Sequence, residues 1–361
     1  MKHSITAKDQ HSTRIEISRE NLIQNIQFIK KKIGNKPLIM AVIKANAYGH
    51  DADLVSKMLT DYVDWFAVAT ISEAENLRKN KISNPILVFA PIKEYDVDRF
   101  IALNVTAVAG SMDELSIIPP GLDFHIEFDT GMGRLGFYVD EWPRISHLMQ
   151  SNGISPKGVM THFATAEQPD SDKVFEQLRQ FNQLTDLIKK EYPSTIFHCS
   201  NSGGVLHYAE WRFDMVRTGI AMYGYAPDDT DFPELKPVLS WKSFIAACKP
   251  IKKGMSVSYG AKWAAPDDGF LLVVPVGYAD GIIRNLSGKL NLFVEGQVIK
   301  QVGVVTMDYV MLYHQFPVKT GTEVEIMGAQ SMNATDWARL SGTISYEVLC
   351  GLHPKIKRVV V

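Results

Sequence analysis

The feature that most constrains the fold is a regular alternation of short apolar runs and helical segments. Eight runs have the length and composition of buried strands, at 38–43, 65–69, 85–89, 105–108, 124–128, 158–161, 195–199 and 213–216. Segments with helical spacing of apolar residues separate them, among them 72–80, 95–103, 141–150 and 170–190. This spacing indicates parallel strands joined by helical crossovers, and eight such units predict an α/β fold, a closed (β/α)8 TIM-type barrel.

The segments before and after this alternation have a different pattern of predicted strands and helices. Residues 14–17 form a short strand-like run, and Ser18 then begins a helical pattern that continues to about residue 32. From Trp241 onward the segments are short, rich in β-formers and separated by glycine turns, with one helix expected near 333–340. We therefore predict a barrel domain over residues 1–240 and a C-terminal, mainly antiparallel β domain over residues 241–361.

Composition excludes several classes of function. The 361 residues are 46% apolar and 22% charged, which is typical of a globular protein. The net charge of −2 gives no indication of a basic surface that would bind nucleic acid or a membrane. The N-terminal residues lack the apolar core of a signal peptide. Three widely spaced cysteines show no metal-site spacing and are best explained as reduced thiols. We expect a cytoplasmic protein with no nucleic-acid, membrane or metal partner.

Lys44 follows directly on the first buried strand, and a polar turn with Asn46, Tyr48, Gly49 and His50 comes next. A lysine at the carboxyl end of such a strand has its stem among apolar neighbours and its amine at a cavity. Desolvation lowers the pKa of an amine there, and a neutral amine can form a Schiff base with an aldehyde. For an isolated lysine, an ammonium group that reaches into water is the ordinary alternative.

The other strand ends carry residues that suit an anionic ligand. In a barrel, catalytic groups lie at the carboxyl ends of several strands. Arg134 stands among three glycines after the fifth strand, and His162 follows the sixth. The glycine turns 201–204 and 217–221 follow the seventh and eighth strands and are candidate phosphate cradles. Each signal alone also fits an ordinary loop, whereas together they place two arginines, a histidine and two anion cradles around Lys44.

Nine blocks of sequence make the resemblance to a known family specific. The chain resembles the alanine racemases, fold type III enzymes that depend on pyridoxal 5'-phosphate (PLP), across nearly its whole length. The blocks are AVIKANAYGH (41–50), DTGMGRLG (129–136), THFATA (161–166), NSGG (201–204), VRTGIAMYG (216–224), VSYG (257–260), VGYADG (276–281), TMD (306–308) and TISYEVLCG (343–351). The resemblance implies a homodimer with shared active sites that interconverts L- and D-alanine and, in bacteria, supplies D-alanine for peptidoglycan.

The resemblance also assigns roles to individual residues. Lys44 would hold PLP covalently and act as the base on one face of the substrate, and Tyr259 would be the second base, in the active site of the partner subunit. The residues implied in cofactor binding are Lys44, Tyr48, Arg134, His162, Asn201, Ser202, Arg217, Gly219, Ile220 and Tyr346. The residues implied in substrate binding are Arg134, Met307, Asp308 and Tyr278.

Two of these assignments have a chemical basis. Arg217 would face the pyridine nitrogen, and because a guanidinium does not give up its proton, that nitrogen stays unprotonated and PLP is a weaker electron sink. This restricts the chemistry to exchange of the α-proton. Tyrosine is a poor base at neutral pH, so Tyr259 needs a cationic or hydrogen-bonding neighbour. The resemblance assigns that part to His162 with Arg217.

Three of the departures from the family pattern bear on the expected site and its entrance. Glu127 stands where many members have a carbamylated lysine that holds the substrate-binding arginine, so we expect Glu127 to pair with Arg134 directly or through water. Ile282 and Val304 replace an aromatic residue and an arginine near the entrance, which leaves open a broader specificity that includes serine or lysine. Arg217 and Tyr259 argue against a PLP decarboxylase of the same fold type. The β domain argues against a non-catalytic PLP carrier.

Overall fold

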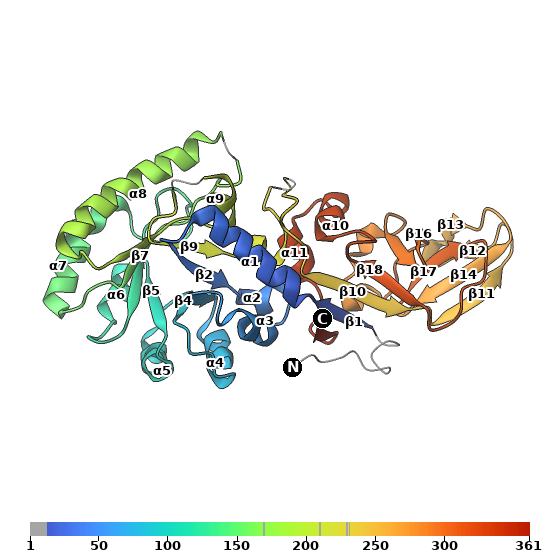
Figure 1. Cartoon of the computed structure of the whole chain (residues 1–361), viewed down its shortest axis with the longest axis horizontal. Helices are drawn as coiled ribbons and strands as arrows, with labels where there is room; N and C mark the ends of the chain where they lie inside the picture. The colour runs from blue at the N-terminus through green and yellow to red at the C-terminus, as the bar shows by residue number, and fades with distance from the viewer. Residues whose placement is uncertain (1–12, 169, 209–210, 229, 231) are drawn as a thin grey trace.

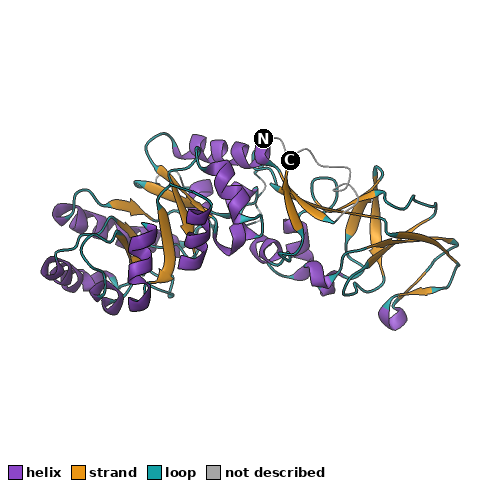
Figure 2. Ribbon diagram, turned by 90° about the horizontal axis from the view of Figure 1, so that it is seen from below, coloured by secondary structure: helices purple, strands orange, loops and turns teal. Residues whose placement is uncertain are grey.

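The computed structural model describes residues 13–168, 170–208, 211–228, 230 and 232–361. A barrel surrounded by helices occupies one end of the molecule and a domain built mostly of strands occupies the other (Figures 1 and 2). Residues 1–12, which belong to the predicted barrel domain, lie outside the described residues. No helix among the described residues is long and apolar enough to cross a membrane.

The predicted barrel is confirmed. Eight parallel strands form one sheet in the order β8-β7-β6-β5-β4-β3-β2-β9. Their bounds are Leu38–Val42 (β2), Trp65–Val68 (β3), Ile86–Pro91 (β4), Thr106–Ala109 (β5), Phe124–Glu127 (β6), Gly158–Met160 (β7), Ile196–His198 (β8) and Met215–Thr218 (β9). The Asp214 amide donates to the Phe197 carbonyl (3.0 Å) and the Arg217 amide to the Ser200 carbonyl (2.9 Å), which joins β9 to the β8 side of the sheet.

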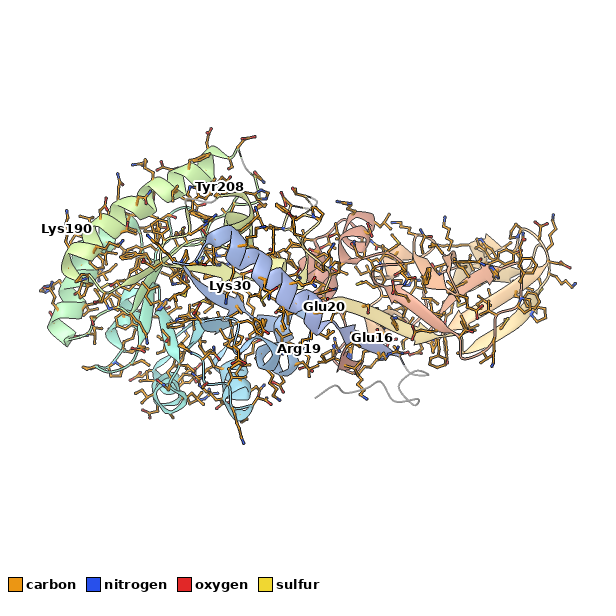
Figure 3. The ribbon with its side chains drawn as sticks, in the orientation of Figure 1. Glu16, Arg19, Glu20, Lys30, Lys190 and Tyr208 are labelled. Atoms are coloured by element: carbon orange, nitrogen blue, oxygen red, sulfur yellow. The ribbon has the colours of Figure 1, made fainter. Side chains whose placement is uncertain are left out.

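Helices follow the strands as the alternation predicts. They are α1 (Arg19–Ile33), α2 (Lys44–Tyr48), α3 (Ala52–Leu59), α4 (Ile71–Lys79), α5 (Val97–Leu103), α6 (Met112–Ser116), α7 (Trp142–Asn152), α8 (Asp172–Glu191) and α9 (Ser202–His207). Ser18 caps α1 through the Asn21 amide, as expected. Glu20 lies in the first turn of α1 and Lys30 in the last, where each complements the helix dipole (Figure 3).

The C-terminal domain contains a nine-stranded, mainly antiparallel sheet in the order β11-β14-β17-β16-β15-β18-β10-β1-β19. Its strands are β1 (Arg14–Ile17), β10 (Leu239–Phe244), β11 (Ala247–Ile251), β14 (Gly269–Val274), β15 (Asn291–Val294), β16 (Gln297–Val302), β17 (Val310–His314), β18 (Glu323–Met327) and β19 (Lys357–Val360). A two-stranded sheet adds β12 (Ser256–Val257) and β13 (Trp263–Ala264). Two helices accompany these strands, α10 (Ala334–Ser341) and α11 (Ser345–Cys350), where the sequence predicted one.

The pairing of β1 links the two ends of the chain. Ile15 pairs with Trp241 of β10 in antiparallel register and with Arg358 of β19 in parallel register. The strand that precedes the barrel therefore belongs to the sheet of the C-terminal domain. A four-residue run that alternates charged and apolar residues identifies a strand but not its partner, because pairing over so long a sequence separation is a tertiary property.

Candidate active site

A cavity of about 370 Å³ lies at the carboxyl ends of the barrel strands. Ten of the predicted site residues line it, namely Lys44, Tyr48, Arg134, His162, Asn201, Ser202, Arg217, Gly219, Ile220 and Tyr346. Nine of them come from the ends of β2, β6, β7, β8 and β9 or the turns that follow, as the barrel requires. Tyr346 comes from α11, so the C-terminal domain also contributes to the cavity wall.

The turn that carries Lys44 has an unusual backbone. Ala45, Asn46, Ala47 and Tyr48 have φ values of 52°, 52°, 54° and 52°, so four consecutive residues with side chains lie in the left-handed region. This conformation costs roughly 1–2 kcal/mol for each residue because Cβ crowds the following carbonyl oxygen. Such strain persists only where the surrounding structure fixes it, and it is typical of functional sites.

Hydrogen bonds from both sides hold this turn. The Ala45 amide donates to a carboxylate oxygen of Glu73 (2.7 Å), and the Ala52 amide donates to the side-chain oxygen of Asn46 (2.9 Å). His50 is fully buried, with Nδ1 3.1 Å from the Ala47 carbonyl oxygen and 3.0 Å from that of Tyr48. Because carbonyl oxygens only accept, Nδ1 carries the proton.

The ring of His50 stacks on Tyr223 at a centroid distance of 4.3 Å. Burial lowers the pKa of this histidine to about 4, so it is neutral at physiological pH. The sequence pattern includes His50 in the polar turn after Lys44 but does not predict that His50 holds this turn. The sequence feature that could have predicted this part is the place of His50, directly after Gly49, which ends the turn.

The environment of the Lys44 amine agrees with the expected desolvation. Burial lowers its pKa, and the positive charge of Arg134 acts in the same direction. The ammonium lies 5.7 Å from the centre of the Phe89 ring and forms no ion pair with any residue that the structure describes. The amine is therefore easier to deprotonate than an exposed lysine.

The two glycine turns expected to form an anion cradle line the same cavity as Lys44. The Ser202 hydroxyl accepts hydrogen bonds from the amides of Gly219 (3.0 Å) and Ala221 (3.3 Å), which fixes the turn after β9 against the start of α9. A Cβ added at Gly219 would lie 2.7 Å from the Tyr48 hydroxyl oxygen, so only glycine fits there. The rings of Tyr48 and Tyr346 are 5.8 Å apart, and burial raises the pKa of both hydroxyls, which keeps them protonated as donors.

Arg217 is buried and held by a dense set of acceptors. Its guanidinium donates to the carbonyl oxygens of His198 (3.0 Å), Thr161 (2.8 Å) and Cys199 (3.0 Å). It also lies 2.8 Å from Nδ1 of His198 and 3.4 Å from Nδ1 of His162. Burial lowers the pKa of Arg217 to about 10, so it remains charged at neutral pH.

Arg217 also fixes the tautomer of a histidine chain inside the barrel. Since the guanidinium only donates, Nδ1 of His198 is an acceptor and its Nε2–H donates to Nδ1 of His125, at 2.8 Å. Burial, with the charge of Arg217, lowers the pKa of His162 to about 3. His162 is therefore neutral. We expect His162 and Arg217 to lie beside the second base, Tyr259, and of these two residues only Arg217 is cationic.

Tyr259, Tyr278, Met307 and Asp308 do not line the cavity. They lie on an exposed surface of the C-terminal domain, which we call the Tyr259 surface. Tyr259 is 71% exposed and Met307 53% exposed. Backbone and hydroxyl contacts join their loops, because Ser258 donates to the Val304 carbonyl (2.7 Å) and the Tyr278 and Ala279 amides donate to the carbonyls of Thr306 and Met307 (both 3.0 Å).

Glu127 lines the same two cavities as Arg134. The side chain is 4% exposed and lines both the main cavity and an adjoining cavity of about 230 Å³, and Arg134 lines both as well. No direct ion pair with Arg134 is present among the described residues, so the direct form of the expected pairing is not observed. Burial raises the pKa of Glu127 to about 7, against the opposing charges of Arg134 and Arg217.

Ile282 and Val304 are 1% and 6% exposed inside the C-terminal domain, and neither lines the cavity. Their replacement of larger residues therefore has no direct contact with the cavity of this chain. No group of three or more histidine, cysteine or carboxylate side chains that could hold a metal ion occurs within the described part of the chain.

The raised pKa of Glu127 predicts how stability depends on pH. Between pH 4.5 and about 7 the folded state binds a proton that the unfolded state releases, so stability falls as pH rises through this range. Glu127→Gln removes this dependence, and we expect the wild-type chain to lose on the order of 2–3 kcal/mol relative to the variant across the range. Urea unfolding at pH 5, 6, 7 and 8 measures it, with exposed Glu94→Gln as control. Wild-type stability that rises with pH relative to the Glu127→Gln variant would contradict it.

Comparison with known proteins identifies the family. Residues 17–227 match the model of the alanine racemase N-terminal domain, and residues 238–360 match that of the C-terminal domain. The alanine racemase of Clostridium kluyveri is 35% identical over 96% of this chain and 93% of the relative, and that of Streptococcus pneumoniae is 36% identical over 93% and 94%.

Solved structures give the same result. Alanine racemase of Clostridium difficile superposes with a TM-score of 0.91 at 32% identity, covering 97% of this chain and 96% of that chain. The Bacillus anthracis alanine racemase with bound L-Ala-P gives 0.89 at 31% identity, covering 97% and 95%. With the barrel, the C-terminal sheet and the cavity at the strand ends, these matches show that the chain belongs to the alanine racemase family.

Proposed function

We propose that this chain is a PLP-dependent alanine racemase that interconverts L- and D-alanine with one base on each face of the substrate, in a homodimer. The observation that carries the proposal is the desolvated Lys44 amine, which shares one cavity with an anion cradle and a buried, charged arginine. In a bacterium we place the activity in the cytoplasm, where its product would be used for peptidoglycan.

The cavity residues fit PLP group by group. Tyr48, Ser202 and Tyr346 supply hydroxyl donors and Ile220 a backbone donor for a phosphate, and the missing side chain of Gly219 leaves room beside the Tyr48 hydroxyl. Asn201 caps α9 through the Gly204 amide (3.0 Å) and so holds Ser202 in place. Arg217 would face the pyridine nitrogen and donate to it. When bound, PLP supplies an electron sink that makes the α-hydrogen of an amino acid acidic.

Lys44 would hold the cofactor and act as the base on one face. Its lowered pKa increases the fraction of neutral amine at physiological pH, and a neutral amine is what both tasks require. Arg134, which forms no ion pair with another described residue, is free to bind the substrate carboxylate at the mouth of the cavity. Its position relative to Glu127, which lines the same cavity, would then depend on the ionisation of that carboxyl group.

The second base would come from another copy of the chain. Tyr259 is on the C-terminal domain, outside the cavity of its own barrel, and its surface exposes Met307, Tyr278 and Tyr309 as well. A contiguous exposed patch of this kind is typical of a protein–protein contact. We propose that it covers the cavity of the partner subunit, where the Tyr259 hydroxyl would approach His162 and Arg217 and the Met307–Asp308 turn would meet the substrate carboxylate.

Substitution of Lys44 tests the cofactor linkage. In Lys44→Ala, borohydride reduction should leave no PLP attached to the chain by mass spectrometry, and racemase activity should fall at least about 10³-fold because both the attachment and one base are lost. Exposed Lys93→Ala should behave as wild type. PLP attached to the Lys44→Ala variant after reduction would assign the cofactor to another lysine.

Mixing two inactive variants tests the shared site. Lys44→Ala and Tyr259→Phe each remove one base, and in a heterodimer one of the two sites regains both residues from different chains. Random exchange makes about half of the dimers mixed, so we expect about one quarter of wild-type activity after co-refolding. A mixture as inactive as its components would place Tyr259 in the site of its own chain, whereas wild-type activity of Tyr259→Phe by itself would place Tyr259 outside the reaction.

A further inference from the structure

The turn that follows Lys44 packs backbone against backbone on the C-terminal domain. Gly49 ends this turn with φ +79°, and a Cβ there would lie 2.2 Å from the carbonyl oxygen of Leu349 at the end of α11. The same helix carries Tyr346 and Cys350 into the cavity wall. The segment that positions Lys44 and the segment that closes the cavity therefore meet at one point.

Arg358 of β19 joins these two segments. Its Nε donates to the Gly49 carbonyl (3.1 Å), and its two terminal nitrogens donate to the carbonyls of Leu352 (3.1 Å), His353 (2.7 Å) and Ile356 (2.7 Å). All four acceptors are backbone atoms. Three lie in the loop after α11 and the fourth ends the left-handed turn. Because the guanidinium is a rigid planar fork, it fixes the position of one segment relative to the other.

The charge of Arg358 strengthens these bonds. The side chain is partly buried, and burial lowers its pKa although Asp51 opposes the shift. No carboxylate forms an ion pair with Arg358 within the described residues, so the carbonyl dipoles are its immediate partners. Hydrogen bonds from a charged donor are roughly twice as strong as neutral ones. Three of the four bonds, those to Gly49, Leu352 and Ile356, are partly buried, so their loss would leave partly buried carbonyls without this donor.

We propose that Arg358 is a positioning residue for Lys44: by holding the Gly49 carbonyl against the loop after α11, it maintains the left-handed turn that aims the amine into the cavity. Arg358 does not itself line the cavity. The proposal rests on the role of Lys44 given above, and it couples the last strand of the chain to the proposed cofactor lysine.

Arg78 of α4 is a matched control. Its guanidinium also donates to four backbone carbonyls, those of Leu103 (2.9 Å), Ile82 (2.6 Å), Asn84 (2.8 Å) and Asn104 (2.8 Å), and burial lowers its pKa as well. These acceptors precede β4 and β5, at the opposite end of the barrel from Lys44. Arg78→Gln therefore removes the same kind and number of bonds away from the cavity.

The test compares wild type, Arg358→Gln, Arg358→Lys and Arg78→Gln by amide hydrogen exchange of the apo chain and by PLP titration. The reporting amides are those of Ala47, Gly49, His50 and Asp51, which are hydrogen-bonded within the turn. We expect Arg358→Gln to exchange these amides about tenfold faster and to raise the dissociation constant of PLP about tenfold, equivalent to ~1.4 kcal/mol. Arg358→Lys, which keeps the charge but not the fork, should lie between it and wild type.

Arg78→Gln should leave exchange over residues 44–51 and PLP affinity unchanged while it lowers global stability. The proposal would be overturned if the amides of this segment exchanged at the wild-type rate in Arg358→Gln. It would also be overturned if Arg78→Gln accelerated their exchange as much as Arg358→Gln does. If Arg358→Gln does not fold, unchanged exchange in Arg358→Lys would do so. Failure of wild type to attach PLP at Lys44 would instead reject the proposed function, and the exchange experiment on the apo chain would still report on Arg358.

Discussion

The site depends on a backbone conformation that an L-residue chain ordinarily avoids. Four residues after Lys44 adopt left-handed φ values, and the cost of roughly 1–2 kcal/mol per residue has to be offset by the surroundings. The compensating contacts come from three directions: Glu73 on α4, the buried His50 against Tyr223, and Arg358 on β19. The amine therefore faces the cavity because both domains hold the turn that follows it.

Burial decides the electrostatics of the cavity. It lowers the pKa of Lys44 and His162 and raises that of Glu127, so each of these groups is driven toward its neutral form. Arg217 is the exception, because a guanidinium with a pKa of about 10 stays charged even when buried among carbonyl oxygens. A charged Arg217 beside a neutral His162 is the arrangement that would stabilise an anionic oxygen or nitrogen nearby. The same field lowers the pKa of the Lys44 amine.

The predicted site residues are divided between the barrel cavity and the exposed surface of the C-terminal domain. Ten residues line the barrel cavity, whereas Tyr259, Tyr278, Met307 and Asp308 lie on the Tyr259 surface of the C-terminal domain. A rigid sheet is a suitable platform for side chains that complete a site elsewhere, because its loops are fixed by contacts such as Ser258 to Val304. The chain thus presents a site and a separate surface that would complete a second one.

The sequence by itself determined the barrel, the C-terminal β domain and the ten cavity residues. The spacing of the strands predicts that their carboxyl ends meet at one mouth of the barrel. The nine sequence blocks then indicated which residues at these strand ends bind the cofactor. Only the tertiary structure decided the partner of β1, the left-handed turn, the parts of His50 and Arg358, and, among the described residues, the absence of a direct ion pair between Glu127 and Arg134. The physical reason is that local patterns encode which face of a segment is buried. Pairing and positive φ depend on contacts between residues hundreds of positions apart, as between Gly49 and Arg358.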